Sequence, residues 1–286
     1  MAKNLVLGGA GFIGGNLARA LVARGEYTRI LTRSSSSVSN IKDILDKVDI
    51  LYRDFMDDVS LRQALKDIDV VFHLISTTFP SMTTESIVYD VFSNLLPTIR
   101  LVELCLDQGV KKIVYASSGG TIYGEPQNIP ISEEPPLQPI SAYGQSKLTI
   151  ENYLNFYAKT TPIDVNVFRI SNPFGFGQKL LGVQGIIAVA MGCAYYNRTL
   201  DIYGKGEAIR DYIYIDDVIQ ALLMAAKQSG SSVVNISSGK GHSVMDIVQI
   251  VEDVSKRSIQ KNFIQNRSTD VNVNILDNRK AYEMYG

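Results

Sequence analysis

The sequence contains little cysteine and little histidine. Cys105 and Cys193 are its two cysteines, and their wide separation without a CxxC spacing argues against a disulfide framework and a zinc site. The two histidines, His73 and His242, have no further metal-binding residues at a suitable spacing, so we expect no metal centre. Unpaired cysteines are typical of a reducing compartment, which predicts a cytoplasmic location.

Excess charge and long hydrophobic runs are also missing. Lys and Arg number 28 against 29 Asp and Glu, and this balance provides no basic field to attract nucleic acid or an anionic membrane. The most apolar stretch, Ile186 to Tyr196, is far shorter than the roughly 20 residues that cross a bilayer and predicts a buried helix. Residues 1–4 run directly into a strand-like pattern, so we expect no secretory signal peptide. Composition therefore argues against nucleic-acid and membrane partners.

Apolar segments alternate with amphipathic ones over the first two thirds of the chain, a pattern typical of βαβ units around a parallel sheet. Residues 127–139 contain four prolines and predict a surface loop. Six apolar runs predict strands covered on both faces, at Leu5–Leu7, Arg29–Thr32, Asp49–Tyr52, Val70–Leu74, Ile113–Ser117 and Val165–Arg169. Helical patterns lie between them at Phe12–Arg24, Ser60–Lys66, Thr98–Gln108 and Tyr143–Tyr157.

This alternation weakens after Asn172, where short strand and helix patterns mix with Gly and Tyr clusters. We therefore expect an α/β fold in which residues 1–172 form a Rossmann doubly wound parallel sheet. Residues 173–286 are expected to form a smaller α/β region that mainly binds substrate.

Glycines follow the first predicted strand at a spacing of three. A strand, this glycine turn and then an amphipathic helix form the context that a dinucleotide-binding loop requires. Gly8 permits the tight turn, Gly11 lets a pyrophosphate approach the backbone, and Gly14 lets the helix pack on the strand. A glycine-rich turn without a ligand is the alternative. The cofactor-binding residues expected in this loop are Gly8, Gly11, Phe12, Ile13 and Gly14.

The residues after the second predicted strand indicate which dinucleotide binds. An Asp or Glu there would bind the ribose 2′-hydroxyl of NAD, but the chain has Arg33 and Ser34. A guanidinium and a hydroxyl suit a 2′-phosphate, so we favour NADP(H) and keep NAD as the alternative. A solvated arginine in a flexible loop would explain the same residues without any such role.

Tyr143 and Lys147 stand four residues apart, which places them on one face of the expected helix. A nearby cation stabilises a phenolate, so Lys147 is expected to lower the pKa of Tyr143 toward the operating pH and make it an acid and base. In isolation, such a pair is more often an ordinary surface pair. Its position after the fifth strand of a GxxGxxG fold favours the catalytic interpretation.

The GxxGxxG loop and the YxxxK pair together resemble the short-chain dehydrogenase/reductase superfamily. Segments 169–175, 202–206, 210–218 and 267–270 are similar to those of its extended branch, the NAD-dependent epimerase/dehydratase family, whose members act on nucleotide sugars. This resemblance implies that a nucleotide diphosphate sugar is the partner molecule. It assigns further cofactor contacts to Asp54, Phe55, Leu74, Ile75 and Ser76, diphosphate contacts to Asn172, Arg210 and Arg267, and a place beside the sugar C2 substituent to Asn274.

One position departs from the family pattern. The residue that normally carries a catalytic hydroxyl after the fifth strand is Gly119 in this chain. Thr121 is the preferred replacement and Ser118 the second. The acidic residues with which related dehydratases eliminate water are replaced by Gly119 and Gly120, which disfavours dehydration.

The resemblance implies C4 epimerisation of a UDP-hexose through a transient 4-keto intermediate. The alternatives are an NADPH-dependent 4-ketoreductase of a 4-keto-6-deoxy sugar nucleotide and a non-catalytic nucleotide-binding protein. Arg33 favours the reductase, whereas only Gly119 supports a loss of catalysis. Members of the family commonly pair through helices after the fourth and fifth strands, so we expect a homodimer to which the apolar face of Thr98–Leu106 contributes.

Overall fold

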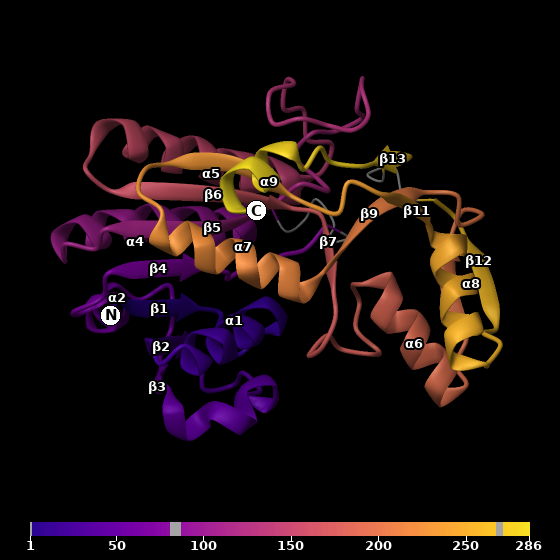
Figure 1. The fold of residues 1–286 in the computed structure, drawn as a ribbon, viewed down its shortest axis with the longest axis horizontal. Helices are drawn as coiled ribbons and strands as arrows, with labels where there is room; N and C mark the ends of the chain where they lie inside the picture. Colours follow the sequence, from indigo (N-terminus) through magenta and orange to yellow (C-terminus); the bar gives the residue numbers. More distant parts are fainter. Residues whose placement is uncertain (1, 81–86, 267–270) are drawn as a thin grey trace.

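The computed structural model describes residues 2–80, 87–266 and 271–286, and its centre is one parallel sheet (Figure 1). In the strand order β10-β6-β5-β4-β1-β2-β3, β2 and β3 lie on one side of β1, and β4 and the later strands lie on the other. The topological switch point is therefore between β1 and β4. This is the expected Rossmann fold, and all six predicted strands are present. The seven strands are β1 (Lys3–Leu7), β2 (Tyr27–Thr32), β3 (Asp49–Tyr52), β4 (Val70–His73), β5 (Lys112–Ser118), β6 (Asp164–Ile170) and β10 (Ser232–Ile236).

The family resemblance implied a strand and turn at residues 235–239, but its place as the seventh strand of the large sheet was not predicted. β10 pairs with β6 in parallel, from Ser232 opposite Asn166 to Ile236 opposite Ile170. Its sequence is short and ends in a Ser-Ser-Gly turn, and its partner lies far away along the chain. Only the tertiary pairing therefore identifies it as part of the large sheet.

Helices cover both faces of this sheet, and each apolar stripe continues into one of two cores. α1 (Phe12–Ala23), the 3₁₀ helix η1 (Ser39–Lys47), α7 (Ile215–Lys227) and α9 (Arg279–Tyr285) cover one face. α2 (Asp58–Leu65), α4 (Leu96–Asp107) and α5 (Ala142–Thr160) cover the other. α4 is preceded by α3 (Ile87–Asp90) and by one π-helical turn, η3 (Val91–Leu95).

The expected dimer surface on residues 98–106 is not available as predicted. Leu101, Val102, Leu104 and Cys105 of α4 are fully or almost fully buried in their own core. The reason is that the apolar stripe of this helix packs on the central sheet and α2. The exposed apolar side chains lie earlier, in α3, η3 and the first residue of α4.

A smaller region stands to one side of the sheet, on the right in Figure 1. It packs α6 (Ile186–Tyr196) against α8 (Val244–Ser255) around a separate core. α6 has the bounds predicted for a buried helix, but Met191 is 50% exposed and Tyr195 is 64% exposed, so only one side is buried. Its strands are β7 (Asn172–Phe174), β8 (Leu200–Tyr203), β9 (Ile209–Tyr214), β11 (Gly241–Ser243), β12 (Lys261–Ile264) and β13 (Val273–Asn274).

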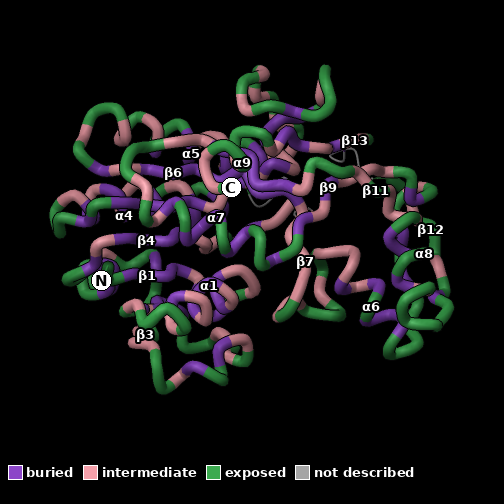
Figure 2. The backbone as a smooth tube through the Cα atoms, in the orientation of Figure 1, coloured by how far each residue is buried: buried purple, intermediate pink, exposed green. Residues whose placement is uncertain are grey.

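The proposed division after residue 172 stays a prediction, and the topology qualifies it. The chain enters the smaller region through β7 and returns to the large sheet with α7 and β10. Figure 2 shows most strands of the large sheet as buried, the edge strand β3 as mainly intermediate, and the outer loops as exposed. No helix in residues 2–80, 87–266 or 271–286 is long and apolar enough to span a bilayer.

Candidate functional site

The glycine loop connects β1 to α1 at the carboxyl edge of the sheet. Gly8 has φ +81°, a conformation that favours glycine, and its carbonyl accepts the Gly11 N–H at 2.9 Å. A Cβ on Gly14 would lie 2.3 Å from the Gly8 oxygen, so this glycine lets the helix approach the turn. Gly11 is the N-cap of α1, and no side chain caps the helix there. Free N–H groups at an uncapped helix start fit a pyrophosphate.

The ends of neighbouring strands surround this loop. A Cβ on Gly8 would lie 3.3 Å from both the Leu74 oxygen and Ile75 Cγ1, so the segment after β4 is adjacent to the loop. Arg33 and Ser34 are exposed directly after β2. These groups come together because parallel strands end at the same edge.

The two cofactor contacts expected after β3, Asp54 and Phe55, differ in where their side chains lie. Asp54 is exposed and accepts the Met56 N–H at 2.9 Å, so its carboxylate lies on the surface. Phe55 is 5% exposed, and its ring packs 5.2 Å from that of His73. The Phe55 side chain therefore belongs to the core beneath the site.

Tyr143 and Lys147 occupy one face of α5, as expected. Ser141 caps this helix by accepting the Gly144 N–H at 3.1 Å, which starts the first turn at Ala142. The Lys147 Nζ donates to the Ala116 oxygen at 3.0 Å and lies 5.7 Å from the centroid of the Tyr143 ring. The helix thus holds the phenol and the ammonium against the end of β5.

The pKa of Tyr143 is raised, whereas from the sequence we expected Lys147 to lower it. Burial raises the pKa of Tyr143 to about 12, and hydrogen bonds with Ser76 and Ser118 lower it only in part. Burial lowers the pKa of Lys147 to about 8, while the carboxylates of Asp90 and Glu151 raise it. Desolvation therefore raises the pKa of Tyr143 where Lys147 was expected to lower it, and at neutral pH the phenol holds its proton.

The structure places Ser118, rather than Thr121, against the phenol. Ser118 lies within hydrogen-bonding reach of Tyr143 and lowers the pKa of its phenol, whereas the buried Thr121 Oγ1 has no hydrogen-bonding partner among the described residues. A Cβ on Gly119 would lie 2.3 Å from Leu276 Cδ1 and 2.9 Å from the Arg169 oxygen. The usual hydroxyl is missing because the C-terminal segment packs directly on this loop.

Asn274 is hydrogen-bonded to the same loop, at Gly119. Its side chain is 1% exposed, and its Nδ2 donates to the Gly119 oxygen at 3.1 Å. It lies beneath the loop and is not among the residues that line the large cavity described next. Its expected place beside a sugar substituent stays a prediction.

A cavity of about 810 Å³ opens in the smaller region. Arg210 of β9 lines it, and the guanidinium donates to the Ile209 oxygen at 2.9 Å. Phe79 also lines it, only three residues after Ser76, which touches Tyr143. Three Cα steps span at most about 11 Å, so the cavity begins close to the phenol. Arg198, Lys205, Tyr203 and Asn272 are further polar lining residues.

The three expected diphosphate contacts have different outcomes. Asn172 lies in β7 and donates through Nδ2 to the Asp211 oxygen at 2.9 Å, which ties it to the strand of Arg210. Arg210 faces the cavity. Arg267 lies outside the described residues, so its role stays a prediction.

Asp211 is a residue that sequence reasoning missed. It is fully buried, and its carboxylate accepts the Ser238 N–H at 2.9 Å, the Ser238 hydroxyl at 2.8 Å and the Gly239 N–H at 3.0 Å. Its position directly after Arg210 was the available signal. It joins the end of β10 to β9 and thereby fixes the strand that carries Arg210.

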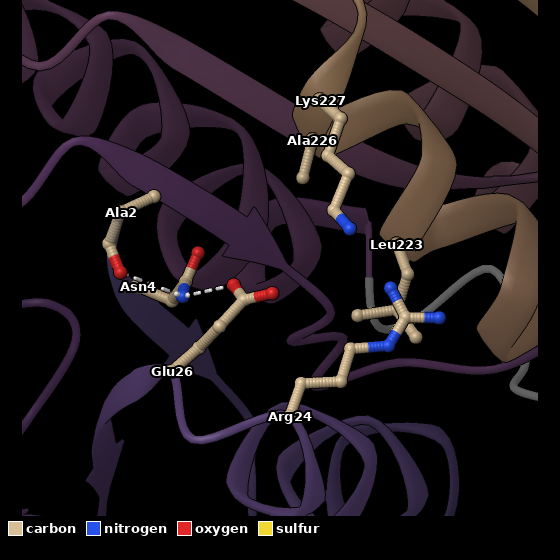
Figure 3. A pocket seen from close by; sticks show the side chains of 7 residues that line it. All are labelled: Ala2, Asn4, Arg24, Glu26, Leu223, Ala226 and Lys227. Carbon is tan, nitrogen blue, oxygen red and sulfur yellow. Dashed lines mark hydrogen bonds between the residues drawn. The ribbon is translucent and has the colours of Figure 1, made fainter.

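A second cavity, of about 640 Å³, lies at the opposite edge, where the parallel strands begin (Figure 3). The Asn4 Nδ2 donates to the Ala2 oxygen at 3.3 Å and to Glu26 Oε2 at 3.1 Å. The Arg24 Nη2 donates to Gln220 Oε1 at 3.1 Å. These donors already bind other lining residues or a neighbouring side chain, whereas the buried Asn4 Oδ1 has no hydrogen-bonding partner among the described residues.

Comparisons with known proteins agree with this geometry. A profile of the NAD dependent epimerase/dehydratase family matches residues 4–237. A UDP-glucose 4-epimerase of Mycolicibacterium smegmatis is 30% identical over 289 residues, which cover 99% of this chain and 92% of the relative. A dTDP-4-dehydro-6-deoxyglucose reductase of Escherichia coli is 31% identical over 99% of this chain and 91% of its own length.

The structure of the Thermus thermophilus UDP-glucose 4-epimerase in complex with NAD matches this fold with a TM-score of 0.91. Its sequence is 27% identical, and the match covers 99% of this chain and 93% of that one. The fold, the glycine loop and the family profile agree over most of the chain. The chain is therefore an enzyme of the NAD dependent epimerase/dehydratase family.

Proposed function

We propose that this enzyme inverts the configuration at C4 of a UDP-hexose through a transient 4-keto intermediate. The observation that carries the proposal is the position of the Tyr143 hydroxyl beside Ser118, with Lys147 one turn further along α5. In its phenolate form Tyr143 can take a proton from a sugar hydroxyl, and in its phenol form it can return that proton. The UDP-glucose 4-epimerase of M. smegmatis supports a UDP-hexose as the substrate.

Tyr143, Ser118 and Lys147 are proposed to have separate roles in the reaction. Tyr143 removes the proton of the 4-hydroxyl and later donates a proton to the ketone oxygen. Ser118 holds the reacting oxygen through a hydrogen bond, and Lys147 provides the positive charge that stabilises the phenolate. The chemistry that a bound nicotinamide supplies is reversible hydride transfer.

The nucleotide diphosphate is proposed to occupy the 810 Å³ cavity. Arg210 lines this cavity, and a guanidinium forms charge-assisted, often paired hydrogen bonds with phosphoryl oxygens. Asn172 lies on the strand beside it and is proposed as a second contact, with Arg267 as a third. The sugar would then extend toward Phe79 and the phenol.

For the coenzyme we propose NADP(H), with NAD as the alternative. Arg33 and Ser34 are exposed at the end of β2, where a guanidinium and a hydroxyl suit a 2′-phosphate. The T. thermophilus enzyme in complex with NAD supports the alternative. We expect Arg33→Ala to weaken NADPH binding and leave NADH binding unchanged in a fluorescence titration, and equal losses for both would contradict the proposal.

A second candidate function is NADPH-dependent reduction of a 4-keto-6-deoxy sugar nucleotide. Arg33 favours it, and so does the E. coli reductase, which is as similar to this chain as the epimerase is. The same residues would serve, because Tyr143 would donate its proton to the ketone oxygen.

One experiment separates the two. The purified protein is first analysed by absorbance and mass spectrometry for a bound coenzyme. It is then given UDP-galactose without added nicotinamide, with Tyr143→Phe as the inactive control. Formation of UDP-glucose supports the epimerase. Stoichiometric consumption of NADPH with a 4-keto sugar nucleotide, without interconversion of hexoses, would overturn it.

We further propose a cytoplasmic homodimer. The cysteines are unpaired and buried, in keeping with a reducing compartment. Val88, Tyr89 and Phe92 are each more than half exposed, and they lie on segments that pack beside α5, where Phe156 is 57% exposed. Apolar side chains gathered in this way suit a second copy of the chain. Sedimentation of the wild type and of Phe92→Glu tests it, since a monomeric wild type would contradict the proposal.

A further inference from the structure

Asp90 is a buried carboxylate that the sequence analysis did not select. It is 3% exposed and ends α3 where the chain continues into the π-helical turn η3. Both α3 and η3 pack against α5, the helix that carries Tyr143 and Lys147. π-helical turns are rare and often occur at functional sites. The carboxylate is thus held at the back of the proposed catalytic pair.

Among the described residues, Asp90 forms hydrogen bonds but no ion pair. Its Oδ1 accepts hydrogen bonds from the Thr78 hydroxyl and from Asn94 Nδ2, the latter at 2.6 Å. Its Oδ2 is buried and has no hydrogen-bonding partner within residues 2–80, 87–266 and 271–286. A buried charge without an ion pair is costly to fold, so a purely structural role would be served better by a neutral amide.

A short path joins this carboxylate to the phenol. Thr78 donates its hydroxyl proton to Asp90, and the Thr78 backbone oxygen accepts the Ser76 hydroxyl at 2.8 Å. The Ser76 hydroxyl lies within hydrogen-bonding reach of Tyr143 and lowers the pKa of its phenol. The three residues 76–78 after β4 therefore connect Asp90 with Tyr143.

Other titratable groups face the same pair, and they must be separated from the effect of Asp90. Glu151 lies one turn after Lys147 on α5, but it is bound to Arg169, with Nη2 and Oε2 2.8 Å apart. Tyr115 of β5 lies under Lys147, with Nζ 4.8 Å from the ring centroid. His73 of β4 is buried beside Tyr115, with ring centroids 5.2 Å apart. Among these groups, Asp90 is the carboxylate without an ion pair in the described part of the chain.

We propose that Asp90 is a positioning residue whose buried negative charge opposes ionisation of Tyr143 and keeps Lys147 in its ammonium form. The proposal rests on the catalytic role proposed for Tyr143. Its charge acts in the same direction in both cases: it raises the pKa of Tyr143 because it opposes a phenolate, and it raises the pKa of Lys147 because it favours the cation. Loss of the charge should therefore lower both.

The test is the pH dependence of kcat in the Asp90→Asn enzyme with intact coenzyme. Asparagine has the same shape and keeps the hydrogen bonds of Thr78 and Asn94 within reach. We expect the midpoint of the rising limb to move to lower pH by about 0.5 to 1 unit. Thr78→Val is the matched control, because it removes a hydrogen bond to Asp90 while the charge remains. An unchanged midpoint in Asp90→Asn, or an equal shift in Thr78→Val, would overturn the proposal.

A second measurement does not depend on turnover. The absorbance of tyrosinate is titrated in the wild type and in Asp90→Asn, and the Tyr143→Phe variant of each background is subtracted to isolate Tyr143. If Asp90→Asn does not fold, Asp90→Ser takes its place, since serine can still bond with Thr78 and Asn94. The same downward shift is expected, and its absence would contradict the role of Asp90. Normal turnover in Tyr143→Phe would instead contradict the proposed function, so the two failures are distinguishable.

Discussion

The two edges of the large sheet differ in what their polar groups do. At the amino edge, Asn4 is bound to Glu26, and Arg24 is bound to Gln220. At the carboxyl edge, the glycine loop leaves an uncapped helix start, and a buried ammonium lies beside a phenol. The cavity at the amino edge and the cavity in the smaller region have similar volumes, about 640 and 810 Å³. The uncapped helix start and the buried ammonium beside a phenol therefore distinguish the carboxyl edge better than cavity size does.

The largest difference in kcat is expected between Tyr143→Phe at the carboxyl edge and its control, Lys227→Ala, at the amino edge. We expect kcat to fall by about 10²- to 10⁴-fold in the first, because the acid and base is removed. The second should keep wild-type turnover. Steady-state rates and a melting curve of both variants give the answer. Comparable losses of kcat in the two would mean that the carboxyl edge is not the catalytic edge.

A smaller effect is expected for Arg210→Ala, with Arg24→Ala as its counterpart at the amino edge. A hydrogen bond to a charged group contributes about 1.5 to 3 kcal/mol, so KM for the nucleotide sugar should rise by about 10- to 100-fold. Arg24→Ala should leave KM unchanged. A normal KM in Arg210→Ala would place the diphosphate elsewhere.

Glycine substitutions distinguish two positions within the carboxyl edge. A Cβ on Gly14 would lie 2.3 Å from a backbone oxygen, whereas a Cβ on Gly120 has no atom within 4 Å. We expect Gly14→Ala to destabilise the protein by about 3 kcal/mol and to weaken coenzyme binding. Gly120→Ala should do neither. Denaturant unfolding and a coenzyme titration check both, and an unaffected Gly14→Ala would refute the close packing of α1 on the loop.

The smallest effect concerns stability at mildly acidic pH. Burial lowers the pKa of His73 to about 3 from 6.5. The unfolded chain binds a proton below pH 6.5 and the folded protein does not, so stability is complete above pH 6.5 and falls as the pH decreases toward 3. By about pH 5 the loss should be about 1 to 2 kcal/mol. His73→Gln should remove this dependence over that range, and the exposed His242→Gln should retain it.

Much of the site could be predicted because its signals are local. Gly8, Gly11 and Gly14 adjoin one strand and one helix, and the spacing of Tyr143 and Lys147 alone places them on one helical face. Ser118 could not be chosen over Thr121 in this way. The loop that carries both hydroxyls is packed by Leu276 from near the far end of the chain, and local sequence does not reveal this contact.

Long-range contacts also explain the other differences. The place of β10 in the large sheet was not predicted because its partner β6 lies far away in sequence. Asp90 and Asp211 were missed because a carboxylate gives no sign of its burial until distant segments close over it. The face of α4 was misassigned to a dimer surface because an apolar stripe does not reveal whether it meets a sheet of its own chain or another protein.

Local sequence patterns were enough to predict the Rossmann fold, the dinucleotide loop and the proposed catalytic pair, since strand, turn and helix signals extend over a few neighbouring residues. Tertiary structure decided which hydroxyl lies near the phenol and which buried carboxylate acts on Tyr143 and Lys147. It also decided that burial raises the pKa of Tyr143. These properties depend on desolvation and on contacts between distant segments, and both arise only when the chain is packed.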